Sequence, residues 1–114
     1  ANVIESMTVI GEVEGRNVIL VDDLVDTAGT LCTAADMLID KGAKSVRAIC
    51  THPVLSGKAY EKIEKSKLLE MIVTDTISLK QETKKIKVIS VAELFASVID
   101  KVLSHESISA HFIM

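Results

Sequence analysis

The feature that most constrains the fold is a run of branched aliphatic residues that recurs along the chain, each time followed by a polar loop. We expect a strand at each run, at residues 17–21, 46–50, 69–73 and 86–89. Apolar residues then recur at helical spacing after most of these loops, which predicts amphipathic helices. Strands that alternate with helices form right-handed crossovers. The sequence therefore predicts a three-layer α/β fold, in which helices cover both faces of a mostly parallel sheet.

Local signals define the ends of these predicted helices. Gly42 follows the last apolar position of the first helix and predicts a C-terminal cap. A short charged helix is expected over residues 58–65. Ser90 and Glu93 have the spacing of a capping box, which predicts the start of a third helix. We expect that helix to bury Leu94, Phe95, Val98, Ile99 and Val102. A short strand is also expected at residues 9–10.

Length and charge limit the classes of protein to be considered. A chain of 114 residues can bury one core, so we expect residues 1–114 to form a single domain. A formal charge of −3, without a basic cluster, argues against nucleic-acid and membrane partners. The apolar runs fall short of the ~20 residues of a spanning helix, and the first residues do not resemble a signal peptide. Cys32 and Cys50 are expected to be free buried thiols, which favours a cytoplasmic location.

The most informative segment is VDDLVDTAGT, which occupies residues 21–30 between the first strand and the first helix. In open α/β sheets, ligands bind beyond the carboxyl ends of the strands, where loops lead into helix N-termini. The backbone N–H groups of this loop, the hydroxyls of Thr27 and Thr30, and the helix dipole would together bind an anion. Gly29 would let a ligand approach the backbone closely, because it has no side chain.

Three carboxylates, on Asp22, Asp23 and Asp26, lie close to this proposed anion site in the sequence. Two like charges ~4 Å apart cost about 4 kcal/mol at an effective dielectric constant of 20, so a pocket for phosphate alone would not carry them. A sugar phosphate removes the conflict, because ionised carboxylates accept hydrogen bonds from vicinal hydroxyls and a divalent cation can offset the remaining charge. The alternative is a solvated turn followed by a helix cap.

The segment at residues 21–30 resembles the phosphoribosyl-binding signature of type I phosphoribosyltransferases and ribose-phosphate diphosphokinases. The flanking segments resemble the diphosphokinases in particular, at residues 9–13, 43–46, 51–57, 74–77 and 107–112. The likeness covers essentially the whole chain. It implies a phosphoribosyltransferase-like fold of Rossmann-type topology. It also implies that the chain is the C-terminal, ribose-5-phosphate-binding half of a larger two-domain enzyme that forms homo-oligomers.

The resemblance also implies residue roles. Asp22 and Asp23 would bind the ribose 2- and 3-hydroxyls, directly or through Mg²⁺. The implied 5-phosphate loop consists of Asp26, Thr27, Ala28, Gly29 and Thr30, where Ala28 replaces the glycine of many transferase signatures. Asp26 is also a candidate catalytic base toward the 1-hydroxyl.

The implied reaction transfers diphosphate from ATP to the 1-hydroxyl of ribose 5-phosphate and forms phosphoribosyl diphosphate. The ATP site, with its metal ligands, would belong to the N-terminal half, and a mobile loop bearing Lys and Arg would precede Ala1. We therefore expect the isolated chain to bind ribose 5-phosphate weakly without turning over.

The C-terminal tail carries a second implication of the resemblance. Ser107, Ser109 and Phe112 would contribute to a regulatory site for nucleotide and phosphate at a subunit boundary. The alternative is that Ile108 and Phe112 only dock the C-terminus on the core. Elsewhere, His52 is expected to structure its loop, and the segment at residues 80–85 is expected to be solvated surface.

The sequence shows partial features of three other functions. A receiver domain would use Asp75 as its phospho-acceptor, but it also needs a Lys at the end of a further strand, where this chain has Ser90. A non-catalytic relative, such as a regulatory subunit or an RNA-binding attenuator, is disfavoured by the intact acidic residues and the lack of a basic face. A phosphoribosyltransferase domain would need a base-recognition hood that the sequence does not display.

Overall fold

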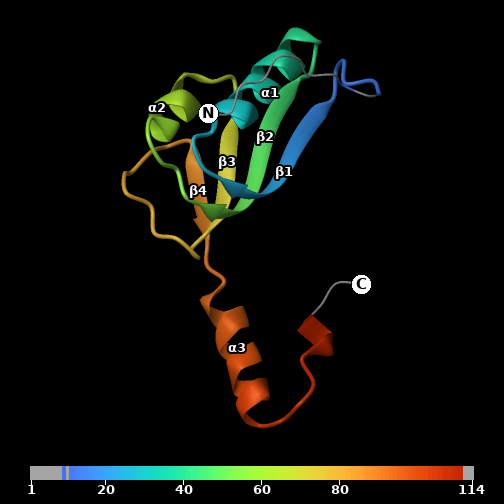
Figure 1. The fold of residues 1–114 in the computed structure, drawn as a ribbon. Coiled ribbons are helices and arrows are strands. Elements are labelled where there is room, and N and C mark those ends of the chain that lie inside the picture. The colour runs from blue at the N-terminus through green and yellow to red at the C-terminus, as the bar shows by residue number, and fades with distance from the viewer. Residues whose placement is uncertain (1–8, 10, 112–114) are drawn as a thin grey trace.

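The computed structural model describes Val9 and residues 11–111. Its sheet is parallel, with strand order β1-β2-β3-β4, and α1 and α2 lie against it while α3 extends from one end (Figure 1). The elements are β1 (Asn17–Val25), α1 (Gly29–Asp40), β2 (Ser45–Pro53), α2 (Ala59–Lys65), β3 (Glu70–Thr74), β4 (Ile86–Ile89), α3 (Ala92–Leu103) and a 3-10 turn η1 (Ser109–His111). The predicted α/β class and parallel sheet are confirmed. Within this part of the chain, no helix has the length and apolar character that spanning a bilayer demands.

The predicted strands and the first two helices are present, with shifted ends. β1 and β2 both extend beyond their predicted C-terminal ends. The strand expected at residues 9–10 is not observed at Val9, and Ile10 lies outside the described residues. Gly42 caps α1 as predicted, at φ 96. Its N–H donates to Ile39 O at 2.9 Å and the Ala43 N–H to Leu38 O at 3.0 Å, the bonding pattern of a Schellman motif.

The hydrophobic core lies between one face of the sheet and the helices α1 and α2. From Val46 to Cys50 in β2 and along all of β3, every second residue is buried there, as expected for the alternating side chains of a strand. The strand and helix side chains that form most of this core are Val46, Ala48, Cys50, Met71, Val73, Ile86, Leu31, Cys32, Ala35, Leu38, Ala59 and Ile63. Both cysteines are free and buried, as predicted. Burial raises the pKa of each thiol, so both remain protonated at neutral pH.

The opposite face of the sheet is not covered by a helix of the described residues. Large apolar side chains are exposed on it, among them Val21 at 78% and Ile19 at 56%. Because α3 buries no residue, the predicted burial of Leu94, Phe95, Val98, Ile99 and Val102 is wrong. The reason is its direction: α3 leaves the end of β4 and points away from the sheet (Figure 1). The radius of gyration is accordingly 16.7 Å, against ~13 Å for a compact domain of this size.

Asp75 and Ser90 hold the start of α3, and the described residues show no reciprocal Glu93 bond of the predicted capping box. The helix begins at Ala92, and its N-cap residue, Val91, makes no side-chain capping bond. The Val91 N–H instead donates to Asp75 Oδ1 at 2.9 Å, and the Ala92 N–H donates to Ser90 Oγ at 3.2 Å. Sequence reasoning missed this contact because Asp75 comes from the end of β3, a different part of the chain.

This contact predicts a pH dependence for the start of α3. Hydrogen bonds from the Ser90 hydroxyl and the Val91 N–H lower the pKa of Asp75 from its ordinary 3.8. Because the pKa is lower in the folded state, the stabilisation is complete above the ordinary value and is lost as pH falls through the folded pKa. An NMR titration should find the Asp75 carboxyl titrating below 3.8, with the Val91 amide shift following the same curve. In Asp75→Asn that amide response should vanish; an Asp75 that titrates at its ordinary pKa would contradict the contact.

Candidate functional site

The acidic segment lies at the carboxyl edge of the sheet, at the junction of β1 and α1. β1 was predicted to end at Val21, but it continues through both acids to Val25. Its pairing explains why: Asp22 lies opposite Cys50, and Leu24 opposite His52, on β2, which also continues beyond its predicted end. The loop is therefore short, and Gly29 and Thr30 already form the first turn of α1.

Most of the predicted site residues line one cavity of about 220 Å³. The predicted members among its lining residues are Asp22, Asp26, Thr27, Ala28, Gly29 and Thr30. Asp23 is not among them, so the structure does not bring the two adjacent acids together as expected. Successive side chains of a strand point to opposite faces of the sheet, and β1 includes both acids. Asp22 is therefore directed toward the cavity and Asp23 toward the uncovered face.

Ala28 precedes α1 in a left-handed conformation, and its side chain cannot cap the N-terminus of the helix. It is the N-cap residue, with φ 66 in the left-handed region, and it is 4% exposed. A side chain there costs about 1–2 kcal/mol relative to glycine, which accounts for the glycine found in similar signatures. No side chain caps α1, so the first N–H groups of the helix are available to an anion.

Asp26 is held in place by the loop that follows β2. Its Oδ1 accepts a hydrogen bond from the Ser56 hydroxyl, and its backbone oxygen accepts one from the Ser56 N–H at 3.0 Å. The Leu55 N–H donates to Val25 O at 3.1 Å on the same side. Ser56 is thus a site residue that sequence reasoning missed, since only the tertiary structure brings it to Asp26.

Polar residues at the ends of β2 and β3 form a network beside the cavity. His52 Nδ1 lies 2.8 Å from Thr76 Oγ1. The hydroxyls of Thr74 and Thr76 both donate to Thr51 O, at 2.7 and 3.1 Å. These bonds tie the two strand ends together, which agrees with the structural role predicted for His52.

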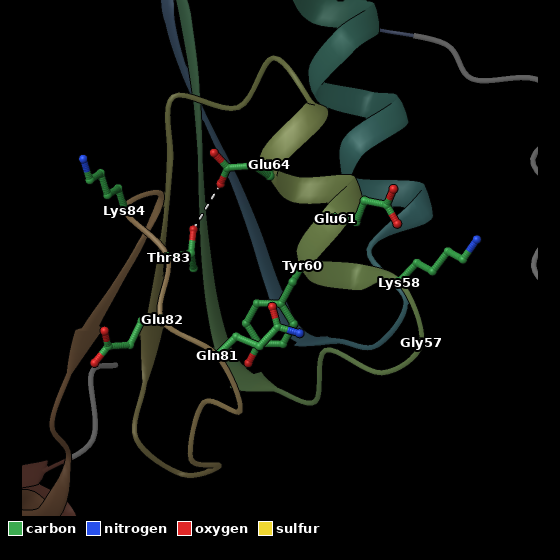
Figure 2. A pocket seen from close by; sticks show the side chains of 9 residues that line it. All are labelled: Gly57, Lys58, Tyr60, Glu61, Glu64, Gln81, Glu82, Thr83 and Lys84. Atoms are coloured by element: carbon green, nitrogen blue, oxygen red, sulfur yellow. Dashed lines mark hydrogen bonds between the residues drawn. The ribbon is translucent and has the colours of Figure 1, made fainter.

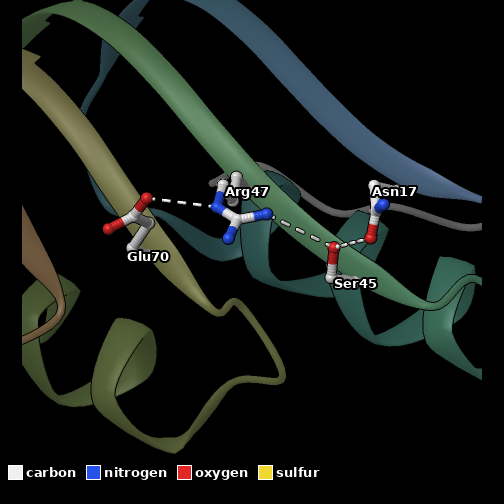
Figure 3. Close-up of polar contacts among 4 residues, drawn as sticks. All are labelled: Asn17, Ser45, Arg47 and Glu70. Atoms are coloured by element: carbon white, nitrogen blue, oxygen red, sulfur yellow. Dashed lines mark hydrogen bonds and ion pairs between the residues drawn. The ribbon is translucent and has the colours of Figure 1, made fainter.

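A second set of polar contacts crosses the other end of the sheet (Figure 3). Asn17, Ser45 and Glu70 are the first residues of their strands. Arg47 Nε donates to Glu70 Oε1 at 3.1 Å, and Ser45 Oγ donates to Asn17 Oδ1 at 2.7 Å. This set joins β1, β2 and β3 at the amino edge, so it is remote from the cavity at the carboxyl edge.

A larger hollow, of about 570 Å³, lies between α2 and the loop at residues 81–84 (Figure 2). Its side chains include the acids Glu61, Glu64 and Glu82 together with Lys58 and Lys84. The charges of both signs point outward in several directions and converge on no common point (Figure 2). This hollow contains no residue predicted from the sequence as part of the site.

The fit of Mg²⁺ can be judged from the available oxygen donors. In the described residues, no cluster of three or more His, Cys, Asp or Glu side chains is arranged to hold a metal. Asp22 and Asp26 line the cavity, whereas Asp23 does not. Mg²⁺ is usually held by one or two carboxylates together with substrate oxygens. The donors therefore fit a cation that arrives with the ligand, with Asp22 in place of the predicted Asp22–Asp23 pair.

The predicted regulatory residues lie in the tail beyond α3. Ser107 Oγ is 2.9 Å from Ser109 Oγ, and both side chains are exposed. Phe112 lies outside the described residues. Ile108 lines an apolar hollow against Leu94 of α3, so it packs on that helix and not on the core as the alternative supposed. The regulatory role stays a prediction.

Comparison with known proteins adds independent findings. The sequence model of the family described as "Phosphoribosyl synthetase-associated domain" matches residues 2–113. The chain is 59% identical over 113 residues to a ribose-phosphate pyrophosphokinase of Wolinella succinogenes, and 56% identical over 113 residues to one of Campylobacter jejuni. Each match covers 99% of this chain and 37% of the relative, so the chain spans little more than a third of those relatives.

A solved structure is similar as well. A crystal structure of phosphoribosylpyrophosphate synthetase from Mycobacterium smegmatis matches with a TM-score of 0.80 and 36% sequence identity. The match covers 84% of this chain and 33% of that chain. The α/β fold with its parallel sheet is therefore shared with that synthetase.

Proposed function

Because the chain belongs to the phosphoribosyl synthetase-associated domain family, we propose that it supplies the ribose-5-phosphate site of a ribose-phosphate pyrophosphokinase. The observation that carries the proposal is the single cavity lined by Asp22 and by the loop Asp26, Thr27, Ala28, Gly29 and Thr30. The names of the similar proteins support a pyrophosphokinase over a phosphoribosyltransferase. The receiver alternative loses support because Asp75 is engaged at the start of α3.

The two ends of the cavity suit the two ends of a sugar phosphate. The 5-phosphate accepts hydrogen bonds from the open N–H groups of α1 and from the hydroxyls of Thr27 and Thr30, each contributing about 1.5–3 kcal/mol. Asp22 accepts from a ribose hydroxyl at the other end. One of its oxygens already accepts the Asp23 N–H at 2.9 Å, and this bond orients the carboxylate. Asp26 maintains the loop through Ser56, and its further role as a base toward the 1-hydroxyl is part of the proposal.

In the proposed reaction, the 1-hydroxyl oxygen of ribose 5-phosphate attacks the β-phosphorus of ATP, and AMP leaves. Catalysis of phosphoryl transfer depends on positioning and on cations that neutralise the developing charge. This chain fixes the acceptor sugar. Mg²⁺ bound with the substrates would offset the charge of Asp22 and of the phosphates. We propose that the ATP site belongs to the rest of a longer protein.

Further parts of the proposal concern the whole protein. We place the chain as a single domain in the C-terminal half of a cytoplasmic enzyme that forms homo-oligomers and has no nucleic-acid or membrane partner. The likeness of residues 107–112 to the family supports this placement. The match covers 37% of the Wolinella succinogenes relative, which is compatible with a chain that forms part of one half of a larger enzyme.

Isothermal titration calorimetry tests the proposed site directly. The chain should bind ribose 5-phosphate more tightly than either ribose or inorganic phosphate, because only the intact ligand engages both ends of the cavity. Mg²⁺ should strengthen binding, and ATP with ribose 5-phosphate should yield no phosphoribosyl diphosphate. Equal affinity for ribose 5-phosphate and inorganic phosphate would overturn the sugar site. Turnover by the isolated chain would overturn the proposal that the ATP site belongs to the rest of a longer protein.

A further inference from the structure

A cation from α2 lies beside the start of α1. The position that a Cβ would occupy on Gly29 is 3.8 Å from Lys62 Nζ and 3.9 Å from Thr27 Oγ1. The ammonium and the hydroxyl therefore flank the same bare face of Gly29. Lys62 belongs to the middle of α2, more than thirty positions along the chain, so only the packing of α2 against α1 brings the two together.

Gly29 is a lining residue of two hollows. It lines the cavity that contains Asp22 and the loop, and it also lines a groove of about 330 Å³ between α1 and α2. Lys62, Lys65 and Asp36 line that groove. Because glycine has no side chain, Gly29 itself places only backbone between the Lys62 ammonium and a ligand bound in the cavity.

Among the described residues, no carboxylate pairs with the Lys62 ammonium, although Asp36 lines the same groove. In the part of the chain that the structure describes, Lys62 forms no ion pair, whereas the neighbouring Lys65 is paired with Glu61 at 2.8 Å. The N-terminus of a helix carries partial positive charge, so a cation there is repelled unless an anion is also present. Lys62 is exposed, and its flexible four-carbon stem leaves the ammonium free to lie elsewhere.

We propose that Lys62 is a phosphate-binding residue that contacts the 5-phosphate from the α2 side of Gly29. The inference rests on the proposed sugar-phosphate site and extends it. A phosphate dianion bound near Asp22 and Asp26 is repelled by both carboxylates, and none of the residues that line the main cavity is cationic. Lys62 supplies a positive charge while the N–H groups of the loop supply directed hydrogen bonds.

Matched single substitutions in the full 114-residue chain test the inference, with calorimetry and NMR as readouts. Lys62→Gln should weaken ribose 5-phosphate binding by about tenfold, the lower end expected for loss of a charge-assisted hydrogen bond. It should leave the weak binding of ribose unchanged, because ribose carries no phosphate. Lys62→Arg should retain most of the affinity. Lys65→Gln makes the same charge change in the same groove and should have little effect, because that ammonium is engaged by Glu61.

The outcomes separate this inference from the proposed function. Wild-type chain that binds ribose 5-phosphate, together with unchanged binding in Lys62→Gln, would overturn the role of Lys62 and leave the sugar site intact. Equal losses in Lys62→Gln and Lys65→Gln would also overturn it, because they would show an effect of net charge alone. Failure of the wild type to prefer ribose 5-phosphate over inorganic phosphate would overturn both. A shift of the Lys62 side-chain NMR signals with ribose 5-phosphate, but not with ribose, would support direct contact.

Discussion

Asp22→Asn is expected to weaken binding of ribose 5-phosphate by about 10- to 100-fold, whereas Asp23→Asn should change it by no more than about twofold. A hydrogen bond to a charged group contributes about 1.5–3 kcal/mol, and each 1.4 kcal/mol corresponds to a factor of ten in affinity. Asp22 lines the cavity, and Asp23 does not. Asparagine keeps the size of the side chain but replaces one acceptor oxygen with a donor.

The comparison of these neighbours is the control. Both substitutions remove one negative charge from the same end of β1, so a purely long-range electrostatic effect would be similar in the two variants. Calorimetry with ribose 5-phosphate distinguishes the two explanations, and circular dichroism verifies that each variant is folded. Similar losses for both variants would show that the two acids act together, as the sequence suggested, and that the alternation along β1 does not separate their roles.

Lys85→Met is expected to lower the free energy of unfolding by about 1.5–3 kcal/mol, the amount typical of hydrogen bonds to a charged group. Lys85 was expected to be solvated, but its ammonium lies at the C-terminal end of α2. There it donates to the backbone oxygens of Ile63, Glu64 and Ser66 at 3.1, 3.2 and 2.8 Å. The last carbonyls of a helix have no partner within the helix, and a cation there is also favoured by the helix dipole.

Lys84→Met provides the matched control for Lys85. Lys84 is exposed, and its side chain forms no hydrogen bond or ion pair within the described residues. It should change stability by less than about 0.5 kcal/mol, as most surface substitutions do. Urea denaturation followed by circular dichroism measures both variants, and methionine preserves the apolar stem in each. If the two variants unfold at the same urea concentration, Lys85 does not stabilise α2.

The amino-acid sequence alone was sufficient for the features that depend on local chemistry. Aliphatic runs predicted the strands, and Gly42 predicted the end of α1, because a positive φ is readily adopted by glycine. The short helix expected over residues 58–65 is present as α2, which buries Ala59 and Ile63. The loop at residues 26–30 was also placed correctly at the carboxyl edge, since strand and helix order determines that position.

Contacts between distant segments were decided by the tertiary structure. Ser56 meets Asp26, Asp75 meets the start of α3, and Lys85 meets the end of α2 only after the sheet has assembled. The two adjacent acids looked equivalent in the sequence, and their separation depends on how far β1 extends, which is determined by its pairing with β2. Periodicity likewise predicted the amphipathic character of α3 but not its direction. The local sequence pattern determines which face of a helix or strand is apolar. Packing between elements that are far apart in the chain determines what that face contacts.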